Sequence, residues 1–295
     1  MNNKSIYALG FFDGVHLGHQ ALLKACQALA TEYGCTAGAV TFAQHPDSLV
    51  FGSKPTLINT MADRHHLLTA MGARSIVTLP FDEAMMHMPW RDFIRLLRSE
   101  YGAVGFACGD DFRFGHAGEG TADILAQYCR AAGLPCAVVP QQSLAGIRVS
   151  SSHIRSLLEN GDVETANRFL GHPHILSGKV VPGKQLGRTI GIPTANLLLP
   201  EELLTPKFGV YATLACFDDK KHPAVTNIGT RPTVEGQGIT VEPWILDFDG
   251  DLYGKEITLE FHQFLRPEKK FESLAQLQAE IRKNAAQTRN FFAKT

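Results

Sequence analysis

The chain has 295 residues, a length at which two domains of ordinary size are expected, each with its own hydrophobic core. Hydrophobic residues make up 44% and charged residues 19%, and the formal net charge of −1 excludes the strongly basic surface of proteins that bind nucleic acid or anionic membranes. No apolar run approaches the roughly twenty residues of a membrane-spanning helix. The six cysteines show neither a Cys-x-x-Cys pair nor a zinc spacing, so we expect a soluble cytoplasmic protein with reduced thiols.

The first half of the chain alternates short apolar runs with helical stretches. Strands are predicted over residues 6–9, 37–42, 75–79, 104–108 and 137–139, and the intervening helices over 20–33, 62–71, 89–100 and 121–132. This rhythm predicts a parallel sheet covered by helices on both faces. Ligands of such sheets bind beyond the carboxyl ends of the strands, so the loops after Leu9, Phe42 and Cys108 are candidate parts of a site.

A helical segment connects the two halves. Residues 152–170 are predicted to form two short helices joined at Asn160-Gly161-Asp162, with Asp162 as the N-cap of the second helix. We expect this segment to act as a hinge and set the domain boundaries at 1–155 for the first domain, 156–172 for a helical linker and 173–295 for the second domain.

The second half reads as a small antiparallel β-barrel with a terminal helix. Strands are predicted over residues 210–217, 224–228, 244–248 and 257–264, with Asp249-Gly250-Asp251 as a hairpin turn. Apolar residues at Leu274, Leu277, Ile281 and Ala285 recur at helical spacing and predict a helix over 274–292.

The segment Gly-Phe-Phe-Asp-Gly-Val-His-Leu-Gly-His at residues 10–19 predicts a phosphate site. Its glycines fall where a strand turns into a helix, so backbone N–H groups and the positive end of the helix face a bound anion. His16 and His19 are three residues apart and can both donate hydrogen bonds to phosphoryl oxygens. The alternative interpretation is that these histidines only cap or pack the helix and that the glycines serve a tight turn.

Together with the Val-Ser-Ser-Ser-His-Ile-Arg segment at residues 149–155, this motif resembles the bacterial bifunctional riboflavin kinase/FAD synthetases, and the resemblance covers nearly the whole chain. It implies a Rossmann-like nucleotidyltransferase domain that transfers AMP from ATP to FMN. It also implies that Arg155 holds the β- and γ-phosphates with Ser151 and Ser152 as hydroxyl donors, although the serine run could be only a helix N-cap. The expected catalytic residues are His16, His19 and Arg155, and the expected binding residues near them are Gly10, Phe12, Asp13, Gly14, Gly18, Ser151 and Ser152.

Two further segments match this family, residues 41–46 (TFAQHP) and 108–115 (CGDDFRFG), and both follow predicted strands. Asp110 and Asp111 could bind ribose or ribityl hydroxyls or Mg²⁺. Phe112 and Phe114 could lie against a flat ring, with core packing as an equally good interpretation of each.

A second site is expected around Gly-Arg-Thr-Ile-Gly-Ile-Pro-Thr-Ala-Asn at residues 187–196, which resembles the riboflavin kinase signature. In an extended segment Thr194 and Asn196 face the same side and present two oxygen ligands for Mg²⁺, and Pro193 stiffens the approach. By resemblance the catalytic base is Glu242, whose alternative is an exposed strand carboxylate. The residues expected to wrap the ATP phosphates are Gly183, Lys184, Gly187 and Arg188; Arg266 and Glu268 lie in the family's flavin-side region or form a surface ion pair.

The chain departs from the family pattern at four positions. The family usually has Asn at Phe11, Pro at Gln44, Thr at Ser152 and often His at Trp244. Phe11 removes a polar group beside the phosphate loop, which makes the adenylyl transfer the less certain activity. Pro243 next to Glu242 implies a strand edge or bulge.

The resemblance implies conversion of riboflavin to FMN and of FMN to FAD, with ATP and Mg²⁺ in both reactions. The alternatives are a chain that retains one of the two activities and a flavin-sensing regulator with inactive sites. The expected partners are small molecules and neither nucleic acid nor membrane, with a monomer or weak homo-oligomer as the assembly.

Overall fold

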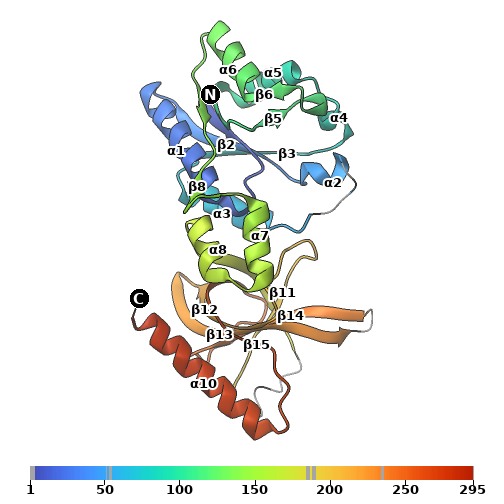
Figure 1. The fold of residues 1–295 in the computed structure, drawn as a ribbon, viewed down its shortest axis with the longest axis vertical. Helices are drawn as coiled ribbons and strands as arrows, with labels where there is room; N and C mark the ends of the chain where they lie inside the picture. The colour runs from blue at the N-terminus through green and yellow to red at the C-terminus, as the bar shows by residue number, and fades with distance from the viewer. Residues whose placement is uncertain are drawn as a thin grey trace. The chain divides into compact units, whose positions relative to one another are not determined.

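The computed structural model describes residues 4–50, 52, 55–183, 187, 191–233 and 236–294. The chain folds into two compact units, Met1–Ser151 and Ser152–Thr295 (Figure 1). The second unit includes the helical segment that was predicted as a linker. Among the described residues no helix is both long and apolar enough to cross a membrane, and the six cysteines are free thiols.

The first unit contains the predicted parallel sheet. Five strands lie in the order β3-β2-β1-β4-β7, and all their pairings are parallel. The strands are β1 (Ser5–Leu9), β2 (Thr36–Phe42), β3 (Ser75–Leu79), β4 (Ala103–Gly109) and β7 (Cys136–Val139), and the long helices between them are α1 (Leu17–Glu32), α3 (Met61–Ala70), α5 (Trp90–Tyr101) and α6 (Ala122–Ala131). The fold class predicted for this half is confirmed, with element ends shifted by up to three residues.

Short elements complete the first unit. They lie in the connections, where periodicity carries little signal, and none of them was predicted. They are η1 (Asp13–Val15), α2 (Pro46–Val50), α4 (Glu83–Met86), η2 (His116–Gly118), the pair β5 (Arg113–Phe114) and β6 (Gly120–Thr121), and the pair β8 (Ser143–Leu144) and β9 (Ile147–Arg148).

Both faces of this sheet are buried. Tyr7 and Leu9 of β1 belong to a core that also contains Phe93 of α5 and Leu125 of α6. The intervening residues Ile6 and Ala8 are also fully buried, and the thiol of Cys26 on α1 donates to the Ile6 carbonyl at 3.1 Å. Because strand side chains alternate between faces, α5 and α6 cover one face and α1 covers the other.

The strand order reverses at β1. From β1 the chain moves outward through α1 to β2 and β3, and then returns across to β4 on the opposite side of β1. The carboxyl ends of β1 and β4 are therefore neighbours whose following loops diverge. In open parallel sheets this switch point is where ligands bind.

The second unit begins with two helices and continues as a closed antiparallel barrel. The helices are α7 (Ser151–Asn160) and α8 (Val163–Leu170); the predicted N-cap is confirmed, because the Asp162 carboxylate accepts a hydrogen bond from the N–H of Thr165 at 3.1 Å. The barrel order is β10-β11-β14-β13-β12-β15. Its strands are β10 (His174–Val181), β11 (Asn196–Leu198), β12 (Gly209–Phe217), β13 (Lys220–Thr233), β14 (Gly236–Ile245) and β15 (Glu256–Pro267), and α10 (Leu274–Phe292) follows as predicted.

The predicted hairpin at Asp249-Gly250-Asp251 is wrong. β14 ends at Ile245, residues 246–255 form a loop, and β15 pairs with β10 and β12 instead of β14. Asp247 has a left-handed φ of 58°, which turns the chain out of the strand. The sequence suggested a tight turn because Asp-Gly is a turn signal, but a tight turn would have left the barrel open.

His174 in the barrel predicts a pH-dependent stability. Its side chain is fully buried, its ring nitrogens have no hydrogen-bond partner among the described residues, and burial, aided by the charge of His172, lowers its pKa to about 3. Below a pH of about 6.5, His174 becomes protonated in the unfolded chain but stays neutral in the folded chain. The free energy of unfolding therefore falls as the pH drops from there towards 3. At pH 5 the loss is about 2 kcal/mol.

We predict that His174→Leu removes this loss. The test is urea unfolding of the second unit at pH 7 and pH 5, where the stability of the wild type should fall by about 2 kcal/mol more than that of the variant. An equal pH sensitivity of the two proteins would contradict the prediction.

Candidate functional site

A cavity of about 270 Å³ lies at the switch point of the first unit. The loops after β1 and β4, the start of α1 and residues 139–142 and 148–151 form its walls. Eight residues that the sequence singled out line it, although they are spread over more than half of this unit: Gly10, His16, Gly18, His19, Asp110, Asp111, Phe112 and Ser151.

The two histidines stand at the first turn of α1. Nδ1 of His16 accepts a hydrogen bond from the backbone N–H of His19 at 3.4 Å, so His16 caps the helix, and the two rings are stacked with centroids 3.7 Å apart. Gly18 allows this arrangement, because a Cβ there would lie 3.2 Å from the His16 ring. The capping interpretation of His16 is therefore correct, and it is compatible with a binding role because both rings also line the cavity.

His19 is neutral near pH 7. Burial lowers its pKa well below the ordinary value, and the charges of His16 and Arg64 lower it further. The residue keeps some exposure towards the cavity, whereas its Nδ1 is buried and has no hydrogen-bond partner within the described part of the chain. A neutral imidazole can donate one hydrogen bond to a phosphoryl oxygen without bringing a full positive charge.

The loop from residue 12 to residue 15 is held in an unusual conformation. Phe12, Gly14 and Val15 have left-handed φ values of 62°, 80° and 39°, a strain that recurs at ligand sites. Asp13 is buried and accepts hydrogen bonds from the N–H groups of Ile58 at 2.9 Å and Asn59 at 3.4 Å.

Phe12, Asp13 and Gly14 shape this loop and do not line the cavity. The ring of Phe12 packs against His19 at 5.1 Å, and the hydroxyl of Ser151 donates to the Asp13 carbonyl at 2.9 Å. The sequence suggested these three residues as nucleotide contacts, but they lie behind the residues that line the cavity.

The two aspartates after β4 have different partners. Asp110 accepts a hydrogen bond from the N–H of Gln141 at 3.3 Å, and Asp111 forms an ion pair with Arg148 at 2.6 Å. Phe114 is buried in the core; Phe112 packs against the same core, stacks on Phe114 with ring centroids 5.4 Å apart, and also lines the cavity. Arg148 was missed, since it belongs to none of the motifs.

Ser152 and Arg155 belong to the second unit on α7. Arg155 follows Ser151 by four residues and therefore lies on the same side of that helix. The roles expected for Ser152 and Arg155 stay predictions.

The second unit has two cavities that share Thr194. One has a volume of about 460 Å³ and the other about 440 Å³, and Thr194 lines both. Alternation along β14 places Glu242 and Trp244 in the smaller cavity and Pro243 and Ile245 in the larger one. Any ligands in the two cavities would meet at Thr194.

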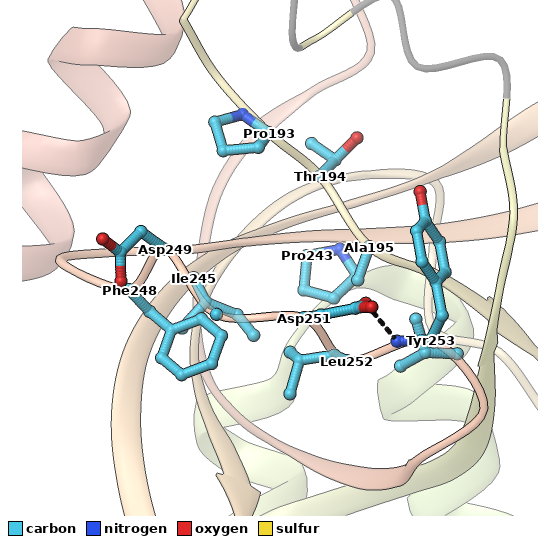
Figure 2. A pocket seen from close by; sticks show the side chains of 12 residues that line it. Pro193, Thr194, Ala195, Pro243, Ile245, Phe248, Asp249, Asp251, Leu252 and Tyr253 are labelled. Carbon is cyan, nitrogen blue, oxygen red and sulfur yellow. Dashed lines mark hydrogen bonds between the residues drawn. The ribbon is translucent and has the colours of Figure 1, made fainter.

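The larger cavity is bounded by two segments far apart in sequence. Figure 2 shows the segment with Pro193, Thr194 and Ala195 along its upper side and the loop that carries Phe248 to Tyr253 along the other. Within that loop Asp251 accepts a hydrogen bond from the N–H of Tyr253 at 2.9 Å. The sequence treated this loop as a turn and missed its place at a site.

The smaller cavity is lined by both polar and apolar side chains. Asn227 lies opposite Glu242 in the register of β13 and β14, and Arg266 and Glu268 also line the cavity; their flavin-side role stays a prediction. Arg266 is held by a hydrogen bond to Asn284 at 3.1 Å and an ion pair with Glu280 at 3.7 Å. The apolar residues that line this cavity are Ile192, Val210, Val225, Trp244, Phe271, Leu274, Leu277 and Ile281.

Close approach explains two glycines of this site. A Cβ on Gly183 would overlap the amide of Asn196, and one on Gly187 would overlap the carbonyl of Ile192. Asn196 itself lines neither cavity, so the structure does not bring it to the same place as Thr194. Lys184 and Arg188, two of the expected phosphate contacts, lie outside the described residues.

Pro243 marks an edge, as expected. On one side β14 pairs regularly with β13, whereas its ladder with β11 is limited to the pair Leu197 and Val241. The missing N–H of proline therefore costs no strand hydrogen bond there, and the larger cavity opens at that side.

Comparisons with known proteins divide the chain in the same way. Residues 1–153 match a family model described as FAD synthetase, and residues 170–292 match one described as riboflavin kinase. Bifunctional riboflavin kinase/FMN adenylyltransferases are 34% identical in Listeria monocytogenes and 35% identical in Escherichia coli K12, each over 98% of this chain and 93% of the relative. A solved structure described as a macrolide-efflux protein from Streptococcus pneumoniae superposes with a TM-score of 0.87 at 29% identity, over 98% of this chain and 95% of that one.

Proposed function

This chain belongs to the family of bifunctional riboflavin kinase/FMN adenylyltransferases, and on that premise we propose that each of its two units carries out one reaction. The second unit transfers the γ-phosphate of ATP to riboflavin and gives FMN. The first unit transfers AMP from ATP to FMN and gives FAD and pyrophosphate. The observation that carries the proposal is a candidate site in each unit: stacked His16 and His19 in one, and Thr194 between two cavities in the other.

The kinase reaction fits the two cavities that share Thr194. We assign ATP to the larger cavity and riboflavin to the smaller one, because the apolar wall from Trp244 and α10 suits a flat flavin ring. Glu242 accepts the proton of the ribityl 5′-hydroxyl as its oxygen attacks the γ-phosphorus. The bond from that phosphorus to the bridging oxygen breaks, and ADP leaves.

Thr194 is the best supported protein ligand for Mg²⁺ in this reaction. The described residues contain no group of three or more His, Cys, Asp or Glu that could hold a metal ion by themselves. A hydroxyl oxygen next to ATP phosphates fits Mg²⁺, which keeps several waters and takes few protein ligands. When bound, Mg²⁺ supplies positive charge to the departing phosphates.

The adenylylation fits the cavity at the switch point. An oxygen of the FMN phosphate attacks the α-phosphorus of ATP, and the bond to the β-phosphate breaks to release pyrophosphate. The N-terminus of α1, His16 and neutral His19 donate hydrogen bonds where negative charge increases. Ser151 lines the same cavity, and the family resemblance implies further phosphate contacts from Ser152 and Arg155.

Neither alternative is favoured. A chain with one retained activity or a regulator with inactive sites would be expected to have lost part of one site, whereas residues 1–153 and 170–292 both match enzyme families. We further propose a cytoplasmic location and small-molecule partners alone, in keeping with the net charge of −1, and a monomeric or weakly associating chain.

We predict that the two reactions can be removed separately. Glu242→Gln should lower FMN formation by about 100-fold or more, because general-base catalysis contributes that much, and should spare the conversion of supplied FMN to FAD. His19→Ala should have the opposite effect. The measurement is chromatographic separation of flavins after incubation with riboflavin or FMN, ATP and Mg²⁺. Loss of both reactions in either folded variant would contradict the assignment of one reaction to each unit.

A pair of variants at Thr194 tests the proposed ligand. Thr194→Val removes the oxygen at nearly constant volume and should raise the Mg²⁺ concentration for half-maximal FMN formation by on the order of 10-fold. Thr194→Ser keeps the oxygen and is the matched control. Equal Mg²⁺ requirements in the Val and Ser variants would exclude the hydroxyl as a ligand.

A further inference from the structure

A buried arginine lies behind the phosphate loop of the first unit. Arg64, on α3, has no exposed surface. Its Nη1 donates hydrogen bonds to the hydroxyl of Thr41 at 3.2 Å and to the carbonyl of Phe42 at 3.0 Å, both at the end of β2. Its other two nitrogens, Nε and Nη2, are buried without any hydrogen-bond partner among the described residues.

The two unpartnered nitrogens form one edge of the guanidinium group. The N–H groups of Nε and Nη2 are parallel, so they can donate hydrogen bonds to two oxygens of one carboxylate or phosphate at once. The bonds to Thr41 and Phe42 occupy the opposite side and fix the orientation of the group. The free edge of Arg64 is thus preorganised for an oxyanion.

The charge of Arg64 also lacks a direct counter-ion. Within the described ranges Arg64 forms no ion pair, and burial lowers its pKa although the nearby charge of Asp13 raises it. The Asp13 carboxylate is used by the N–H groups of Ile58 and Asn59. A buried cation that forms no ion pair is costly to desolvate, and a ligand that supplies an anion would offset that cost.

Phe11 covers this arginine. The guanidinium carbon lies 4.0 Å from the centre of the Phe11 ring, and the ring, itself partly exposed, has its edge against His45 with centroids 4.5 Å apart. The backbone at this position is tied down, because the hydroxyl of Thr41 donates to the Phe11 carbonyl at 2.8 Å. A turn of this side chain alone would therefore uncover the face of the Arg64 guanidinium group on which the ring lies.

The adenylylation requires a cation for the acceptor. Two anions meet in this reaction, the FMN phosphate and the α-phosphate of ATP, and their repulsion has to be offset. Arg148, which lines the cavity of the first unit, is already paired with Asp111. Arg64 is close enough to the reacting region for its charge to lower the pKa of His19.

We propose that Arg64 binds the phosphate group of FMN, the acceptor in adenylyl transfer, and that Phe11 is the side chain that moves aside to admit it. The inference rests on the proposed function of the first unit. The ring offers the guanidinium only a cation–π contact, whereas a phosphate would accept two charge-assisted hydrogen bonds from Nε and Nη2 and would neutralise the charge.

The first test compares the substrates of the adenylylation. Arg64→Met should raise the KM for FMN by on the order of 10- to 100-fold and leave the KM for ATP within about twofold, because only the acceptor loses its anchor. Arg64→Lys, which keeps the charge without the fork, should give a smaller rise for FMN and again none for ATP. Thermal unfolding and the riboflavin kinase rate of the same proteins are the controls for folding.

The second test removes the Phe11 ring from the guanidinium group of Arg64. Phe11→Leu should lower the KM for FMN by about two- to fivefold, because the phosphate no longer has to displace an aromatic ring from the cation. A purely structural role of Phe11 predicts the opposite, since the smaller side chain would loosen the loop. A raised KM for FMN in Phe11→Leu would overturn the role of Phe11.

The outcomes separate this inference from the function on which it rests. Absence of FAD with the wild-type protein would contradict the proposed function itself. Formation of FAD by the wild type together with an unchanged KM for FMN in Arg64→Lys and Arg64→Met would overturn only the anchor. An equal rise in the KM values for FMN and ATP would assign Arg64 a structural role and would also overturn it.

Discussion

The alternation of side chains along a β-strand is the constraint on which both sites depend. In β1, Tyr7 and Leu9 join the core under α5 and α6, and the residues between them face α1, so helices can cover both faces of the sheet. In β14, Glu242 and Pro243 line different cavities because neighbouring residues face opposite sides. A one-residue shift in the register of β14 would exchange these faces and remove the Glu242 carboxylate from the smaller cavity.

Parallel strands and reversal of strand order create the first site in a comparable way. The carboxyl ends of β1 and β4 are neighbours only because the chain crosses from β3 to the other side of β1. The stacked histidines after β1 and the aspartates after β4 reach one cavity for this reason. The strained loop between β1 and α1 is held by the Asp13 carboxylate, which accepts a hydrogen bond from the N–H of Ile58, so Asp13 can matter to this site without lining it.

Much of this architecture could be predicted from the sequence, since it depends on local periodicity and on motifs. The five parallel strands, their four long helices and the terminal helix over residues 274–292 follow from apolar spacing. The prediction of a hairpin at residues 249–251 was wrong, because Asp-Gly favours a turn of any kind and does not say which strands pair. The pairing of β15 with β10 and β12 is decided by closure of the barrel. Arg148 and the loop from Phe248 to Tyr253 were missed for a related reason: they reach their cavities through tertiary packing and carry no motif. The burial of Arg64 could not be predicted either, because an arginine within an amphipathic helix usually faces solvent.

The most direct measurement of the central claim, two phosphoryl chemistries in one chain, follows the origin of the phosphorus atoms in the product. Purified protein is incubated with riboflavin and with ATP labelled at either the α- or the γ-phosphorus, and the FAD is isolated. The account predicts one γ-phosphorus from the kinase reaction and one α-phosphorus from the adenylylation in each FAD molecule. FAD that carries no γ-label, or an incubation that yields no FAD, would contradict it.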